Sequence, residues 1–91
     1  NREASEILAS CGVHGCTDVT GFGLLGHGRE MALGSGVTLE IEAAQVPLLD
    51  GVRDYARAGA IPGGLRNNRD FASCDVEVAG DIPDDLLAIL Y

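Results

Sequence analysis

The apolar residues at the start of the chain follow a helical period. Positions i, i+3, i+4 and i+7 of this segment are apolar: Ala4, Ile7, Leu8 and Cys11. Residues 2–11 are therefore predicted to form a short amphipathic helix. Similar spacing predicts three further helices: one over residues 24–33, one between Pro47 and Gly59, and one that starts at Pro83 with acidic side chains at its positive end.

Three other segments have patterns typical of β-strands. Residues 37–42 and 74–79 alternate between apolar and polar side chains, and residues 15–20 contain one valine and two threonines, which favour strands. A loop rich in turn-forming residues is predicted over residues 61–68. This order of helices and strands predicts an α+β fold, in which helices pack on a small mixed sheet.

The chain has the length of a single domain. Its 91 residues are enough for one compact domain and too few for two. The first residue is Asn1 instead of Met, and the apolar pattern of the last residues ends without a capping residue. We therefore expect residues 1–91 to be one partial domain of a longer protein.

The charged residues limit the partners that we expect. Six arginines, no lysine and fourteen acidic residues give a formal net charge of −8. Because nucleic-acid binding depends on clustered cations, no nucleic-acid partner is expected. Without lysine, the chain also lacks the residue that a P-loop or a Schiff base requires.

Apolar runs and cysteines indicate the cell compartment. No apolar run approaches the roughly 20 residues that cross a bilayer, and the first residues lack the layout of a signal peptide. Three cysteines without C-x-x-C spacing do not predict a disulfide framework. We therefore expect a cytoplasmic location and no membrane partner.

Cysteine and histidine also form a local cluster. Cys11, His14 and Cys16 have the spacing C-x-x-H-x-C and offer three zinc ligands, whereas a structural zinc site needs four. The remaining candidates for a fourth ligand are His27 and Cys74. Buried thiols and a histidine in a turn are the alternative interpretation.

The stretch of greatest chemical interest covers residues 16–27. Its three glycines have the spacing G-x-G-x-x-G: Gly21, Gly23 and Gly26. This spacing is typical of a tight turn with backbone amides at the start of a helix, where anions bind. A strand is predicted on each side of the helix, and Glu40 or Glu42 lies about 20 residues after the first glycine. The segment therefore has the sequence pattern of a dinucleotide-binding unit. A nucleotide- or dinucleotide-binding module without its own chemistry is therefore one hypothesis.

Asp18 favours a different ligand. A carboxylate three residues before the first glycine would repel a pyrophosphate unless a divalent cation lay between them. Because Mg²⁺ takes one or two carboxylates together with phosphate oxygens, the sequence favours a magnesium-nucleotide site. Thr17 and Thr20 could bond phosphate, or could simply be strand-forming residues. His27 is expected to pack against the helix or cap it.

The stretch from Cys16 to His27 resembles the characteristic sequence that opens the C-terminal domain of selenophosphate synthetases (selenide, water dikinases). These enzymes belong to the superfamily of aminoimidazole ribonucleotide synthetase. Later blocks resemble the same family in the same order: Arg29–Ala32, Val46–Leu49, Pro62–Gly64 and Arg66–Asn67. Leu65 departs from the small hydroxyl residue that the family is expected to carry there.

This resemblance implies a two-domain, homodimeric parent enzyme. The parent would convert ATP, selenide and water into selenophosphate, AMP and phosphate, with Mg²⁺ on the nucleotide. Asp18 matches the family aspartate that binds this Mg²⁺. The expected nucleotide contacts lie around it: Thr17, Thr20, Gly21 and Gly23. The catalytic cysteine or selenocysteine and its lysine belong to the N-terminal domain of the family. No catalytic residue is therefore expected in this chain, which should be inactive alone.

Overall fold

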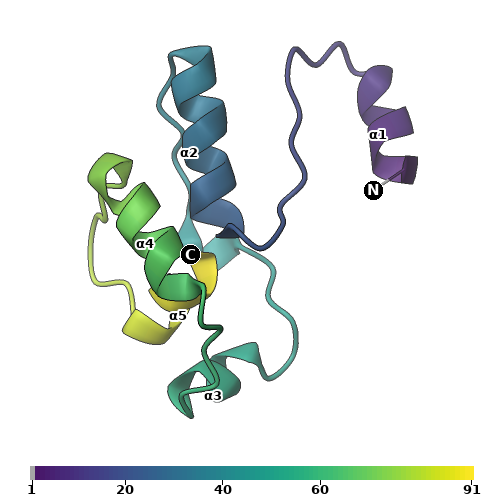
Figure 1. Cartoon of the computed structure of the whole chain (residues 1–91). Coiled ribbons are helices and arrows are strands. Elements are labelled where there is room, and N and C mark those ends of the chain that lie inside the picture. The colour runs from purple at the N-terminus through teal and green to yellow at the C-terminus, as the bar shows by residue number, and fades with distance from the viewer. Residues whose placement is uncertain (1) are drawn as a thin grey trace.

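The computed structural model describes residues 2–91, and that part of the chain is all-helical. Its α-helices are labelled in Figure 1: α1 Arg2–Ala9, α2 Gly23–Ser35, α3 Val52–Arg57, α4 Leu65–Ala72 and α5 Asp84–Leu90. Two short 3-10 helices accompany them, η1 Ala43–Gln45 and η2 Ser73–Asp75. Helices α1, α2, α3 and α5 confirm the four helices predicted from apolar spacing.

The predicted mixed sheet is wrong. Residues 2–91 contain no β-strand: residues 15–20 and 37–42 are irregular, and the segment 74–79 begins inside η2. No backbone hydrogen bond joins residues 38–41 or 77–82 to another described segment. An alternating pattern favours an extended backbone, but a strand forms only where a second segment pairs with it. The fold class of the described chain is therefore all-α instead of α+β.

One of these segments packs on a helix. In α2, a Cβ atom at Gly28 would lie 3.0 Å from Leu39 Cδ2 and 3.8 Å from Ile41 Cδ1. Gly28 is buried, so the two apolar side chains approach the helix where it has no side chain of its own. The apolar positions of the alternating pattern thus contact a helix, while its backbone stays unpaired.

Helix α4 occupies part of the loop that was predicted over residues 61–68. Pro62 and the two glycines after it form a turn, in which the Leu65 N–H donates to Pro62 O at 3.1 Å. The helix that follows is mostly polar, with apolar side chains only at Leu65, Phe71 and Ala72, so its composition indicates a loop. Ala72 at its C-terminal end has no exposed surface. Packing of α4 against α2 therefore supports a helix that composition did not predict.

Helices α2, α4 and α5 form the body of the molecule, and α3 packs against α5. Its buried apolar residues are Ala72, Leu86, Leu90 and Tyr91. Helix α1 lies apart from this body, at the end of an extended segment (Figure 1). The accessible surface is 6939 Å², whereas a compact monomer of this mass would expose about 5000 Å². None of the helices in residues 2–91 is long and apolar enough to span a membrane.

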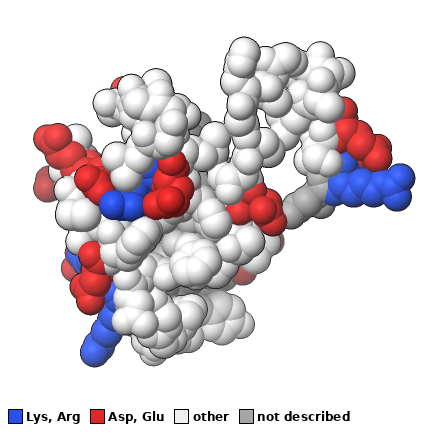
Figure 2. All heavy atoms as spheres, turned by 45° about the horizontal axis from the view of Figure 1, so that its top comes forward, with Lys and Arg blue, Asp and Glu red and all other residues white. Residues whose placement is uncertain are grey.

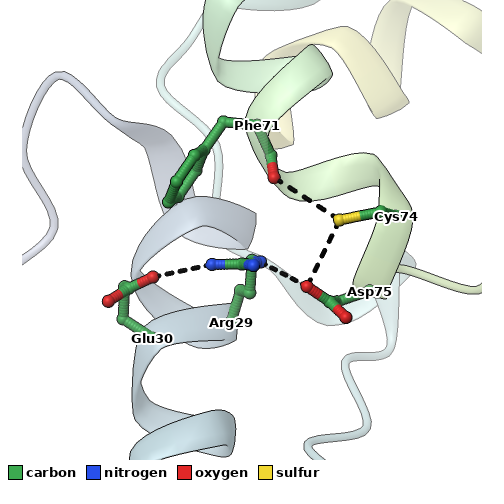
Figure 3. Close-up of polar contacts among 5 residues, drawn as sticks. All are labelled: Arg29, Glu30, Phe71, Cys74 and Asp75. Atoms are coloured by element: carbon green, nitrogen blue, oxygen red, sulfur yellow. Dashed lines mark hydrogen bonds and ion pairs between the residues drawn. The ribbon is translucent and has the colours of Figure 1, made fainter.

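Two arginine–aspartate pairs connect these elements. Arg53 of α3 donates from Nε to Asp85 Oδ2 at 2.7 Å and from Nη2 to Oδ1 at 3.2 Å. Arg29 of α2 donates from Nε to Asp75 Oδ2 at 2.6 Å, and its guanidinium lies 4.6 Å from the centre of the Phe71 ring (Figure 3). These hydrogen bonds hold the pKa of both aspartates below the ordinary value.

Candidate functional site

The predicted site residues lie on one continuous stretch, which runs from the irregular loop at 15–20 through a turn into α2. The Gly23 N–H donates to Thr20 O at 3.1 Å and closes this turn. Gly23 has a φ of +79°, in the left-handed region, and a Cβ atom there would overlap the carbonyl group of Tyr91. The entry of the chain into α2 therefore requires glycine at position 23.

The His27 side chain connects the loop at 15–20 to α2 through hydrogen bonds. Its Nε2 accepts the backbone N–H of Thr20 at 3.1 Å and lies 3.0 Å from Thr20 Oγ1. Its Nδ1 lies 3.4 Å from Thr17 Oγ1. Because Nε2 is an acceptor, the neutral ring carries its proton on Nδ1, which can donate to Thr17. The ring also meets Phe22 edge-on, with centroids 5.9 Å apart.

The sequence predicted a packing or capping role for His27 but not its threonine partners. The available signal was spacing: His27 follows the turn by one helical turn and lies seven residues after Thr20. A side chain at that place faces back toward the residues before the helix. The structure therefore brings Thr17, Thr20 and His27 together, and Asp18 lies between the two threonines in the sequence.

Asp18 lies between the two bonded threonines and is exposed. Its carboxylate is a hard oxygen ligand of the kind that Mg²⁺ takes, usually one or two per ion with phosphate oxygens and water in the other positions. Within the part of the chain that the structure describes, no three His, Cys, Asp or Glu side chains gather closely enough to hold a metal ion. The chemistry of the Asp18 carboxylate is compatible with one position in the coordination shell of such an ion.

Backbone amides supply a second feature of this turn. Among the described residues, the N–H groups of Gly21 and Phe22 donate to no other backbone group, whereas the Gly23 N–H is taken by Thr20 O. The Thr20 hydroxyl is already within bonding distance of His27. The amides of Gly21 and Phe22 are therefore candidate donors to an anion at this helix start.

The other side of the turn is tied to α4. Asn68 Nδ2 donates to Gly21 O at 2.9 Å and to Tyr91 O at 2.8 Å. Asn68, Tyr91 and the turn border a pocket of about 320 Å³. Most of its other walls are apolar: Val52, Ala56, Ile61, Leu65, Ala88 and Ile89. In the sequence, Asn68 is marked only by its place in the predicted loop over residues 61–68.

The other candidate sites are not assembled in the described residues. All three cysteines have free, exposed thiols, and Cys11 Sγ donates to Ile7 O at 3.4 Å instead of joining a metal cluster with His14 and Cys16. A dinucleotide unit needs strands on both sides of its helix. Over residues 2–91 these strands are absent, so the glycine spacing lacks the sheet that this hypothesis requires.

The charged side chains form no continuous basic surface on the face shown in Figure 2. Arginine atoms appear there as separate patches, each next to acidic side chains. Arg29, for example, contacts both Asp75 and Glu30 (Figure 3). Such pairing leaves little positive charge for a polyanion on this face.

Comparison with known proteins assigns the family. The family model described as "AIR synthase related protein, C-terminal domain" matches residues 2–65. The chain belongs to this family. Its sequence is also 47% identical over 90 residues to "Selenide, water dikinase" of Clostridium botulinum (strain Alaska E43 / Type E3). The aligned region covers 99% of this chain and 26% of that relative.

Two further relatives have similar names. "Selenide, water dikinase" of Caldanaerobacter subterraneus subsp. tengcongensis is 54% identical over 71 residues, or 78% of this chain and 21% of the relative. "Selenide, water dikinase 2" of Peptoclostridium acidaminophilum is 43% identical over 91 residues, or 100% of this chain and 26% of the relative. The chain thus spans about a quarter of the length of these proteins. No solved structure matches it. The resemblance to selenide, water dikinases is confirmed.

Proposed function

We propose that the chain is part of the C-terminal domain of a selenide, water dikinase and contributes to the site for Mg²⁺ and the ATP phosphates. The observation that carries this proposal is the 47% identity, over 99% of the chain, to a relative of that name. The activity belongs to the longer protein, which converts ATP, selenide and water into selenophosphate, AMP and phosphate. That protein is proposed to be a cytoplasmic homodimer.

Asp18 is the proposed Mg²⁺ ligand. It stands on the loop that His27 holds through Thr17 and Thr20. The amides of Gly21 and Phe22 are proposed to bind a phosphate oxygen at the start of α2, where the helix dipole favours negative charge. When bound, Mg²⁺ offsets the charge of the phosphate oxygens. This chain then orients the Asp18 carboxylate and the backbone amides of Gly21 and Phe22.

The remaining groups of the active site are proposed to come from the N-terminal domain. Mg²⁺ in such sites is held by carboxylates together with the phosphate oxygens of a bound nucleotide, and no lysine is available in this chain. The isolated chain should therefore form no AMP from ATP in a buffer that contains selenide. AMP formation by the purified chain would contradict this division of the site.

The ligand assignment is tested by Asp18→Asn in the full-length enzyme that the proposal implies. Asparagine keeps the size of the side chain but removes the charge that attracts Mg²⁺. We expect turnover to fall at least tenfold at limiting Mg²⁺, with partial recovery at high Mg²⁺, as measured by AMP and selenophosphate formation. A weaker ligand costing about 1.4 kcal/mol produces such a tenfold change.

Asp81→Asn is the matched control, because Asp81 is an exposed aspartate in the irregular segment between η2 and α5. It should leave the Mg²⁺ dependence unchanged. Equal behaviour of the two variants would refute the role of Asp18. Micromolar NAD binding without Mg²⁺ would instead favour a dinucleotide-binding module.

A further inference from the structure

Asn68 connects the glycine turn to two other parts of the fold. It lies in the middle of α4, is half-buried, and reaches Gly21 O at 2.9 Å and Tyr91 O at 2.8 Å with the same side-chain nitrogen. Gly21 precedes α2 and Tyr91 follows α5. One side chain therefore holds together the start of α2 and the residue after α5.

Asn68 is the described side chain that donates to both carbonyl groups. Within residues 2–91, no backbone N–H donates to Gly21 O or to Tyr91 O. The amide of asparagine has two N–H donors, so a single nitrogen can serve both acceptors. A carboxylate of the same shape has only acceptors and would face two carbonyl oxygens. The site thus discriminates between asparagine and aspartate on chemical grounds.

The position of Gly21 affects the whole candidate phosphate site. Gly21 supplies one of the two amides that have no backbone acceptor among residues 2–91, and it follows Thr20, whose N–H is bonded to His27. Asp18 stands two residues before Thr20 on the same loop. A shift of Gly21 would therefore displace the amide donors directly and strain the bond that holds the loop.

We propose that Asn68 is a positioning residue for the phosphate-binding turn. It acts through Gly21 O and Tyr91 O and does not itself touch the nucleotide. The inference rests on the proposed function, because it concerns the same Mg²⁺-ATP site. It adds that the site depends on α4, an element 47 positions farther along the chain than the turn.

The test compares Asn68→Asp and Asn68→Ala with Asn67→Asp and Asn67→Ala in the full-length enzyme. Asn67 is the adjacent exposed asparagine of the same helix, so its variants control for changes in α4 itself. We expect both Asn68 variants to raise the KM for Mg²⁺-ATP about tenfold, since two hydrogen bonds are lost. The kcat should change by less than about threefold, because substrate binding weakens more than the chemical step.

A purely structural role gives a different result. If the unfolding temperature of the Asn68 variants falls while their KM stays that of the unsubstituted enzyme, the inference is overturned. It is also overturned if the Asn67 variants raise KM to the same extent. Asn68→Ala introduces no charge, so its KM for Mg²⁺-ATP decides the test if Asn68→Asp does not fold.

The unsubstituted enzyme offers an independent measurement. The side-chain amide protons of Asn68 should exchange slowly with solvent, and their NMR signals should shift when Mg²⁺-ATP is added. Exchange at the rate of Asn67 would overturn the inference even without any variant. If Asp18→Asn alters the Mg²⁺ dependence and the Asn68 variants do not alter KM, only this inference fails. If neither has an effect, the proposed function fails as well.

Discussion

His27 determines how the loop that carries Asp18 is held. Its two ring nitrogens contact Thr17 and Thr20, one on each side of Asp18. A helix residue thereby orients a loop that has no regular structure of its own. The three glycines differ in their importance. Only Gly23 combines a positive φ with a close backbone neighbour, while a Cβ atom at Gly21 would meet nothing within 4 Å.

We expect His27→Ala to release the Thr20 amide. The variant loses the acceptor at 3.1 Å, and a hydrogen bond of about 1 kcal/mol corresponds to roughly five- to tenfold faster amide exchange. Hydrogen exchange measured by NMR on this chain tests the prediction. His14→Ala is the control, because His14 is exposed and lies before the loop. Unchanged exchange at Thr20 in the His27 variant would show that the ring does not hold the loop.

At the scale of elements, two arginines of α3 pair with one aspartate of α5. Asp85 of α5 is only 12% exposed and receives two hydrogen bonds from Arg53. Arg57, also from α3, places its Nε 3.2 Å from the same carboxylate. The hydrogen bond from Arg53 lowers the pKa of Asp85, against the opposing effect of burial. These ion pairs between α3 and α5 require an ionised Asp85.

This arrangement predicts acid sensitivity with a defined sign. Since the pKa of Asp85 is lower in the folded than in the unfolded chain, its stabilising contribution is present above the ordinary value of 3.8 and is lost as pH falls through the lowered pKa. We expect Asp85→Asn to reduce the stability at pH 7 and to flatten its decline below about pH 4. Thermal unfolding followed by circular dichroism across this range is the measurement.

Asp84→Asn provides the comparison, because Asp84 occupies the first turn of the same helix and both variants lose charge near its positive end. The difference between the two variants then reports the contact with Arg53. If both lose the same stability at pH 7, the pairing of α3 with α5 contributes nothing measurable.

At the scale of the whole molecule, α1 is the least supported element. It has no buried residue, lies apart from the body in Figure 1, and has one internal exposed ion pair, Arg2 with Glu6. Isolated helices shorter than about 12 residues are marginal in water, and α1 has eight residues. Amphipathic spacing alone therefore predicted its existence without predicting a packing partner.

We expect the amides of α1 to exchange close to the rate of an unstructured peptide, while those of α5 exchange at least tenfold more slowly. Helix α5 contains the buried Leu86 and Leu90, whereas the apolar Ile7 of α1 is 60% exposed. Hydrogen–deuterium exchange resolved by mass spectrometry compares the two helices in one sample. Protection of α1 equal to that of α5 would show that α1 packs against another surface in solution.

The sequence by itself determined four of the helices, because their apolar spacing is a local property that needs no distant partner. It also located the glycine turn and the acidic side chain of the candidate site, although it predicted a strand over residues 15–20, which are irregular. The family resemblance rested on the same stretch and was confirmed by its relatives. Residue patterns within about twelve positions contain this information.

Only the tertiary structure decided which segments meet. The alternating segments remained unpaired because strand formation depends on a neighbouring backbone, which local sequence does not specify. Helix α4 formed in a polar region because it packs against α2. The bond from Asn68 to Gly21 joins residues 47 positions apart, and the approach of Tyr91 to Gly23 spans the fold as well. Such contacts arise when helix faces meet in three dimensions, so no spacing along the chain predicts them.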